Sequence, residues 1–270
     1  MSTAHISTLY RNHVQVPEVP GITWCAGASV ITVSNGGRCH AVGGGERGRI
    51  TGFSHQSRLR LLRVIGNVRR DAELPLFVVL TYPNEFPTAR ASKKHIKAFW
   101  ERFKREFPGH GSIWKLEPQE RGAPHYHILT WGCDLKAMQA WIPGAWYAIA
   151  GGGDGRHLAW HKGLCGNGNK HCVQQVRSWR GVWAYAAKYL GKTFKVEGWE
   201  SAGRYWGVIN PGNIPFGEIR IQELARPEAV QVQRYQRRFT RLRTRSRNRS
   251  MTIFCDADQW VEKLELIPGN

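Results

Sequence analysis

His125 and His127 are one residue apart in the middle of the chain, in a segment that otherwise has the pattern of a buried strand. Successive side chains of a strand point to opposite faces, so both imidazoles lie on one face, while Tyr126 and Ile128 lie on the other. Two neighbouring imidazoles make a poor core, which indicates that this face of the strand has another use. The segment that precedes them contains Glu117, a carboxylate that can complete a set of metal ligands.

The turn residues PQERGAP, at 118–124, separate the histidine strand from the strand before it, so the two strands are predicted to pair as a hairpin. In that pairing Trp114 and Leu116 take the core face, and Glu117 takes the opposite face, beside the two histidines. Two imidazoles and a carboxylate suit a divalent ion such as Mn²⁺ or Mg²⁺, acting as a Lewis acid on a phosphodiester. The alternative is a pair of half-exposed strand histidines that bind no metal.

A second group of reactive side chains lies on the predicted helix at 180–192. At 100° per residue, Tyr185, Lys188, Tyr189 and Lys192 gather on one arc of this helix. A phenol is a competent nucleophile toward an activated phosphate, and a lysine one turn away stabilises a phenolate or a phosphotyrosine. The alternative is an amphipathic helix with a stripe of tyrosines and no catalytic role.

The charge of the chain indicates a polyanionic partner. The formal net charge is +19, and nine arginines but only one acid fall within residues 226–249. Contacts from such a segment are expected to go to phosphates, whether it is helical or extended. The candidate DNA contacts are Arg177, Arg180, Arg237 and Arg238.

Several classes of protein are not favoured by the sequence. No run approaches the roughly 18 consecutive apolar residues of a membrane helix, and the first twenty residues lack the pattern of a signal peptide, so we expect a cytoplasmic protein. The six scattered cysteines are expected to be reduced thiols. A cluster of His157, His161, Cys165, His171 and Cys172 has the ligand types of a zinc site, but its spacings fit no standard finger, so we expect no structural zinc there.

The patterns along the chain predict an α+β protein with a central antiparallel sheet of about five strands. Its parts are expected to be an N-terminal arm, hairpin and basic helix at 1–70, a main domain at 71–225 and an arginine-rich segment at 226–270. The expected elements are a hairpin around Asn35-Gly36 within 28–42, helices at 54–70, 92–107, 134–148 and 180–192, strands at 75–83, 112–117, 125–131, 172–176 and 217–224, and a glycine-rich loop at 150–172.

Three segments in the same order resemble the motifs of the HUH endonucleases, specifically the two-tyrosine rolling-circle replication initiators of single-stranded DNA phages and related plasmids. They are PLFVVLTYP (75–83), EPQERGAPHYHIL (117–129) and YAAKYLGK (185–192), and RYWGVINPGNIP (204–215) and RYQRRFTRLR (234–243) resemble flanking sequence of such initiators. The resemblance implies an RRM-like sheet with the metal on one face, held by His125, His127 and Glu117, and with the nucleophiles Tyr185 and Tyr189 on a helix across it.

The resemblance also implies an activity and its partners. The implied reaction nicks a single-stranded or hairpin origin, leaves a 5′-phosphotyrosine and a free 3′-OH, and later rejoins the strand. A separate helicase and a DNA polymerase would act beside the protein, in the cytoplasm of a bacterial host cell. A transposase or relaxase of the same superfamily is the nearest alternative, although Tyr10 is a poor match to the N-terminal nucleophile of relaxases. A non-catalytic nucleic-acid-binding regulator is the alternative from another class.

Overall fold

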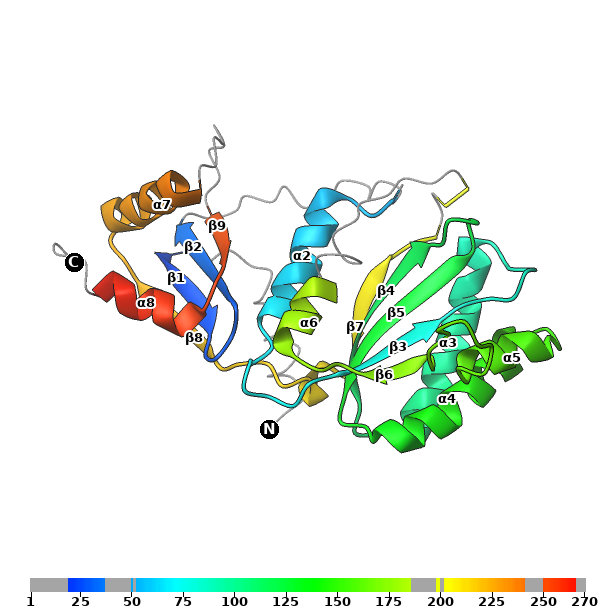
Figure 1. Ribbon diagram of the computed structural model, residues 1–270. Coiled ribbons are helices and arrows are strands. Elements are labelled where there is room, and N and C mark those ends of the chain that lie inside the picture. Colours follow the sequence, from blue (N-terminus) through cyan, green and yellow to red (C-terminus); the bar gives the residue numbers. More distant parts are fainter. Residues whose placement is uncertain are drawn as a thin grey trace. The chain divides into compact units, whose positions relative to one another are not determined.

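The computed structural model describes residues 19–36, 50, 52–185, 198–199, 202–240 and 250–265. The chain divides into two compact units, each with its own sheet (Figure 1). One unit consists of Arg47–Leu61 and Glu73–Ile214, and the other of Met1–Glu46, Leu62–Ala72 and Pro215–Asn270. The helix α2 (His55–Gly66) contributes residues to both.

The larger unit is built on a five-stranded antiparallel sheet with the strand order β6-β3-β5-β4-β7. Its central strands are apolar and β-branched or aromatic at most positions, as expected for strands buried on at least one face. The strands are β3 (Leu76–Leu80), β4 (Gly111–Pro118), β5 (Pro124–Trp131), β6 (Val173–Gln175) and β7 (Trp206–Ile209), followed by a 3₁₀ turn at Pro211–Asn213. The predicted α+β fold with a central antiparallel sheet is therefore confirmed.

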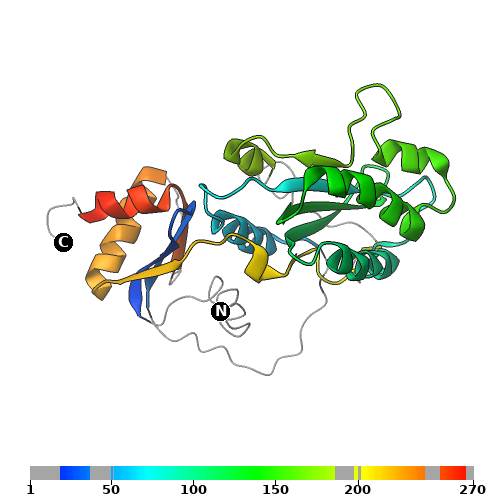
Figure 2. The same ribbon diagram turned by 90° about the horizontal axis from the view of Figure 1, so that it is seen from below.

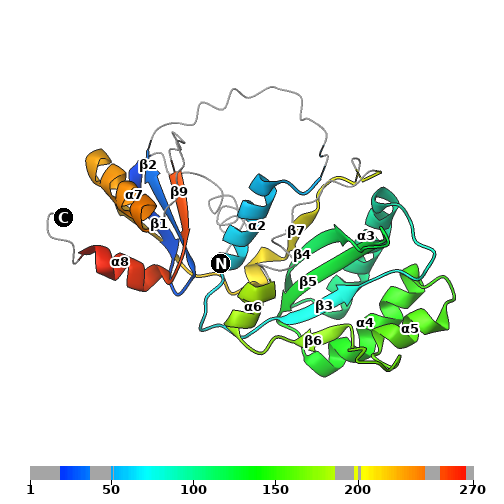
Figure 3. The same ribbon diagram turned by 45° about the horizontal axis from the view of Figure 1, so that its top comes forward.

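Two helices, α3 (Ala89–Glu106) and α4 (Leu135–Ala150), lie beside this sheet (Figures 1 and 3). Each begins at a side-chain cap, since Thr88 accepts a hydrogen bond from the backbone of Ala91, and Asp134 from that of Ala137. Their buried aromatic side chains pack on the face that carries Tyr126, which is fully buried and shares a 2.8 Å hydrogen bond with the hydroxyl of Ser92. One face of the sheet is thus core, and the opposite face carries the two histidines.

The glycine-rich segment at 150–172 differs from its prediction as a loop, because it contains the helix α5 (Gly155–His161). The glycines lie at its two ends, whereas residues 156–161 contain none. Asp154 caps the helix by accepting hydrogen bonds from the backbone of Arg156 and His157. Overall glycine density therefore hid a short helix that has its own cap. The next helix, α6 (Trp179–Tyr185), follows β6.

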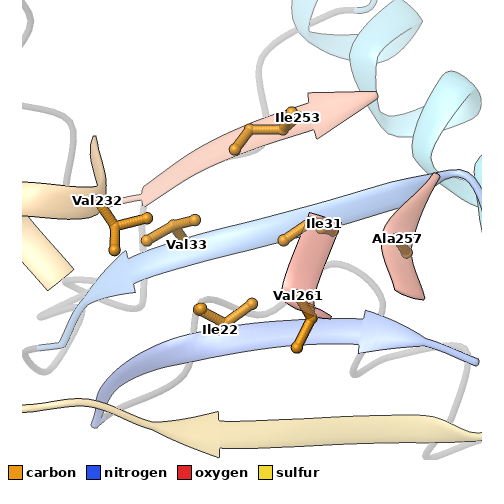
Figure 4. Packing of buried hydrophobic residues seen from close by; sticks show 7 residues of the cluster. All are labelled: Ile22, Ile31, Val33, Val232, Ile253, Ala257 and Val261. Atoms are coloured by element: carbon orange, nitrogen blue, oxygen red, sulfur yellow. The ribbon is translucent and has the colours of Figure 1, made fainter. Parts of the chain in front are cut away.

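The smaller unit is a four-stranded antiparallel sheet with the order β8-β1-β2-β9, and α7 and α8 supply residues to its core. Figure 4 shows this core: Ile22 from β1, Ile31 and Val33 from β2, Ile253 from β9, Val232 from α7, and Ala257 and Val261 from α8. The elements are β1 (Pro20–Cys25), β2 (Val30–Asn35), β8 (Ile219–Glu223), α7 (Arg226–Thr240), β9 (Ser250–Phe254) and α8 (Ala257–Glu265).

An N-terminal hairpin is present, but its turn is not the predicted Asn35-Gly36. The hairpin joins β1 to β2 through residues 26–29, and β2 pairs on its other side with β9. Both edges of β2 are therefore occupied, and Asn35-Gly36 is the end of a strand rather than a hairpin turn. Of the arginine-rich segment, residues 226–240 are helical, which answers the question left open between helix and strand.

None of the helices within the described residues is both long and apolar enough to cross a lipid bilayer.

Candidate functional site

The two predicted strands around the histidines pair in the predicted register. β4 and β5 run antiparallel, with Glu117 opposite His125 and Lys115 opposite His127. The connecting turn contains Gly122 at φ +81, a conformation that glycine adopts without strain. Because paired residues share a face, the sheet brings both imidazoles and the carboxylate together on the side opposite to Tyr126. The predicted grouping of these three side chains is therefore present in the structure.

The three side chains are in close contact. Nε2 of His127 lies 2.6 Å from Oε1 of Glu117, and the imidazole rings of His125 and His127 are 4.3 Å apart between centroids. Phe77 of β3 stacks on the ring of His127 at 5.7 Å, with an interplanar angle of 8°. The histidine ring is thus held between a strand neighbour and the glutamate.

A buried lysine completes the group. The ammonium of Lys115, whose side chain is 1% exposed, donates a 3.0 Å hydrogen bond to Oε2 of Glu117 and lies 4.7 Å from the centre of the Phe53 ring. Glu117 therefore accepts from His127 with one oxygen and from Lys115 with the other. Strand alternation alone predicts that Lys115 lies on this face, whereas its contact with Glu117 depends on the folded structure.

Electrostatics fix the charge states of the group. Burial by itself raises the pKa of Glu117, but the hydrogen bond from His127 and the ammonium of Lys115 outweigh burial and lower this pKa to about 2. Burial lowers the pKa of His125 to about 3 and also lowers the pKa of His127. At neutral pH the site holds an ionised carboxylate and two neutral imidazoles, which are the protonation states in which these groups bind a metal ion.

The turn after β4 holds His125 from its second ring nitrogen. Nε2 of Gln119 lies 2.9 Å from Nδ1 of His125, and the Nε–H of Arg121 donates to Oε1 of Gln119. Arg121 also donates to the backbone carbonyls of Tyr82 and Pro83, which follow β3. The hairpin turn is therefore tied both to the histidine and to the neighbouring strand. Sequence reasoning treated these residues only as a turn; a long polar side chain two residues beyond a predicted ligand was the available signal.

A second pair of histidines supports the end of β3. His157 and His161 lie one turn apart on α5, and Nε2 of His161 accepts a hydrogen bond from the backbone N–H of Thr81 at 3.3 Å. Nε2 of His157 lies 2.9 Å from the carbonyl oxygen of Thr81, which also accepts from Nε1 of Trp146. These two histidines are thus engaged in fixing α5 and α4 to the strand, rather than gathered with Cys165 and Cys172.

The donor set of the site has the right chemistry for a divalent ion but not the form of a finished cage. Among the residues that the structure describes, no group of three His, Cys, Asp or Glu side chains is arranged to hold a metal ion. The direct contact between Glu117 and His127 occupies the positions that such an ion would take. Binding an ion there requires this contact to open, while the ionised carboxylate and the neutral imidazoles remain available.

The predicted nucleophiles lie mostly outside the described residues. Tyr185 is the last residue of α6, its side chain is not among those described, and Lys188, Tyr189 and Lys192 lie beyond the described part. α6 follows β6, whose last residue Gln175 pairs with the start of β3, at the end of the sheet away from His125.

The predicted DNA contacts are placed in part. Arg177 and Arg180 are exposed, just before and within α6. Arg237 and Arg238 lie on α7 in the smaller unit, and the side chain of Arg238 is not among those described.

Comparison with known families gives a match over part of the chain. Residues 75–194 match the family of the replication-associated protein ORF2, and the matched region is less than half of the chain. This region runs from the start of β3 past α6 and contains Glu117, both histidines of β5 and both predicted nucleophilic tyrosines. The match supports a role of the chain in DNA replication, and with it an interaction with DNA. No curated protein and no solved structure matches the chain significantly.

Proposed function

We propose that the chain is a replication initiator of the two-tyrosine HUH type, which nicks single-stranded DNA at an origin. The observation that carries the proposal is the convergence of His125, His127 and Glu117 on one sheet face, inside the region that matches a replication-associated family. A single-stranded or hairpin origin, a separate helicase and a DNA polymerase are the partners that this role requires, in the cytoplasm of a bacterial host cell.

In the proposed reaction, Tyr185 or Tyr189 attacks a backbone phosphate. The phenol loses its proton, its oxygen forms a bond to phosphorus, and the bond from phosphorus to the 3′ oxygen breaks. The 3′ oxygen takes up a proton and becomes a free 3′-OH, while the 5′ end stays attached to the protein as a phosphotyrosine. Lys188 and Lys192, each three residues after a tyrosine, stabilise the phenolate or the resulting phosphate diester.

His125, His127 and Glu117 would hold a Mn²⁺ or Mg²⁺ ion. When bound, such an ion supplies Lewis-acid stabilisation of the negative charge that develops on the phosphodiester. The chain's own contribution is to keep the imidazoles neutral by burial and to keep the carboxylate ionised beside Lys115. Gln119 and Arg121 orient the ring of His125 from the turn, as partners of metal-binding histidines do in other proteins.

Two tyrosines allow two successive cleavages by one molecule. During rolling-circle replication the second cleavage takes place while the first 5′ end is still held, so a second nucleophile is needed. We propose that Tyr185 and Tyr189 alternate in this role. Either tyrosine alone then supports a first cleavage, but release of a rejoined circle requires both.

The test is a covalent adduct on a denaturing protein gel. Single-stranded circular DNA bearing the origin is mixed with the protein in Mn²⁺ or in EDTA, with the Tyr185→Phe, Tyr189→Phe and double variants beside the wild type. The matched control is Tyr147→Phe, on α4. The proposal predicts a metal-dependent adduct that persists in each single variant and in Tyr147→Phe, and that is absent from the double variant.

Three results count against the proposal. An adduct that persists in the double variant would remove the tyrosines from the mechanism. Salt-sensitive DNA binding without any adduct would make the chain a non-catalytic binder, and an adduct that forms equally in EDTA would remove the metal.

A further inference from the structure

A pocket of about 450 Å³ lies beside the histidine face of the larger unit, between strands β3 and β6 and the loop that joins α5 to β6. Figure 2 shows this loop extending beyond the strands. The pocket is large enough for a small ligand, since ligand sites are about 300–1,000 Å³. Its lining includes Val79, Trp160, Asn167, Lys170, His171 and Gln174.

The pocket shares a wall with the candidate metal site. Val79 lines the pocket and pairs with His127 in the register of β3 and β5, so the two side chains lie on the same face. Neighbouring strands are separated by about 5 Å. Gln174, on the adjacent strand β6, pairs with Phe77, which stacks on the ring of His127. A DNA strand with a phosphate at the histidines therefore has an adjoining nucleotide within reach of this pocket.

Trp160 gives the pocket an aromatic wall. Its side chain is exposed at 36%, although tryptophan is usually among the more buried residues. The ring packs edge-on against the buried His161 at 5.1 Å between centroids, so its orientation is supported from behind. An exposed and supported aromatic ring is the device by which proteins stack single-stranded bases.

The polar groups of the pocket suit a nucleotide. Lys170 is exposed and no lining residue is acidic, so the pocket favours an anion. Nδ1 of His171 accepts a hydrogen bond from the backbone N–H of Val173, which leaves the ring's proton on Nε2 as a donor in the neutral form. Within the described residues the side-chain amide of Asn167 has no hydrogen-bond partner, and this residue has φ +46, which is uncommon for a residue other than glycine.

We propose that this pocket binds one base of the single-stranded DNA next to the phosphate at the histidines. Trp160 stacks on the base, Lys170 lies against its phosphate, and the amides of Asn167 and Gln174 read its edge. The proposal rests on the proposed function for the identity of the bound strand. It adds a base preference at one position, which the phosphate chemistry of the metal site alone does not supply.

The test measures binding, so that it does not depend on cleavage. A fluorescent single-stranded DNA of about 20 nucleotides, enough to cover one binding site, is selected from a random pool for binding to the full chain in EDTA. A single abasic site is then moved along this DNA. For the wild type, loss of the base at one position is expected to weaken binding by about 10- to 100-fold, the effect of one stacked base.

Three variants assign that base to the pocket. In Trp160→Ala the same abasic position should make no further difference to affinity. Asn167→Gly removes the amide but keeps the loop conformation, since glycine accepts the φ of +46 found there, and it should reduce the preference among the bases at that position. Leu164→Ala, in the same loop but outside the lining, is the matched control and should behave as wild type.

An unchanged abasic profile in both Trp160→Ala and Asn167→Gly, with folding intact by circular dichroism, would overturn the pocket proposal. The outcome is separate from that of the nicking reaction. A pocket-dependent abasic profile without any covalent adduct would keep the base pocket and reject the nuclease, whereas an adduct with an unchanged profile would do the reverse.

Discussion

Substitution of His161 by glutamine should change how the stability of the chain depends on pH. His161 is fully buried, and its Nε2 accepts a hydrogen bond from the backbone N–H of Thr81. Burial, together with the nearby imidazoles of His157 and His171, lowers the pKa of His161 to about 4 against the backbone hydrogen bond to His157, which raises it. The ring is therefore neutral in the folded chain and becomes charged more easily in the unfolded chain.

The sign and size follow from proton linkage. With an unfolded pKa of about 6.5, the unfolded chain binds more protons than the folded chain between about pH 4 and pH 6.5. The contribution of His161 to stability is complete above that window and is lost as the pH falls through it. For these two pKa values, the loss between about pH 7 and about pH 5 is about 2 kcal/mol.

The assay is urea unfolding at about pH 7 and about pH 5 in EDTA, on the wild type and on His161→Gln. Glutamine keeps a hydrogen-bond acceptor near the position of Nε2 but takes up no proton in this range. The free energy of unfolding should therefore fall by about 2 kcal/mol less in the variant than in the wild type on acidification. His55→Gln, at an exposed histidine of α2, controls for the substitution itself. Equal falls in the wild type and in His161→Gln would refute the assignment.

Two further predictions concern charged groups. Glu117→Gln leaves the ammonium of Lys115 buried without its carboxylate and should lower the free energy of unfolding by about 3 kcal/mol or more. The double variant Glu117→Gln/Lys115→Met should recover much of this loss in chemical denaturation, and a double variant no more stable than the single one would contradict the ion pair's role. Arg177→Ala and Arg180→Ala should each make the salt dependence of single-stranded DNA binding less steep by about 0.7 in log–log slope, for one phosphate contact each. Arg105→Ala, on α3, should leave the slope unchanged, and an equal change there would argue against specific contacts.

The sheet that carries the candidate site could be predicted from the sequence because its information is local. The alternation around His125 and His127 fixes which side chains share a face, and the short turn at 119–123 fixes the pairing of β4 with β5. Once the pairing is known, the position of Glu117 beside His125 follows from parity alone. These inferences needed neighbouring residues only.

The remainder depends on contacts between distant residues. That His157 and His161 bond to Thr81 requires α5 to pack at the end of β3, and no local pattern gives this. The pairing of β2 with β9 likewise joins segments that are far apart in the sequence, so the Asn35-Gly36 pair was taken for a hairpin turn. A turn-forming dipeptide predicts a bend in the chain, but it does not say which strand comes alongside.

The smaller unit has a consequence for how the chain is made on the ribosome. Its hairpin β1–β2 emerges early, but its outer strands β8 and β9 are encoded near the other end. At about 5–20 residues per second, the roughly 200 residues between β2 and β9 take about 10–40 s to translate. During this interval both edges of the hairpin lack their strands, and open edges invite pairing with other nascent chains. A message cut short before β8 would yield the larger unit together with a hairpin that cannot be completed.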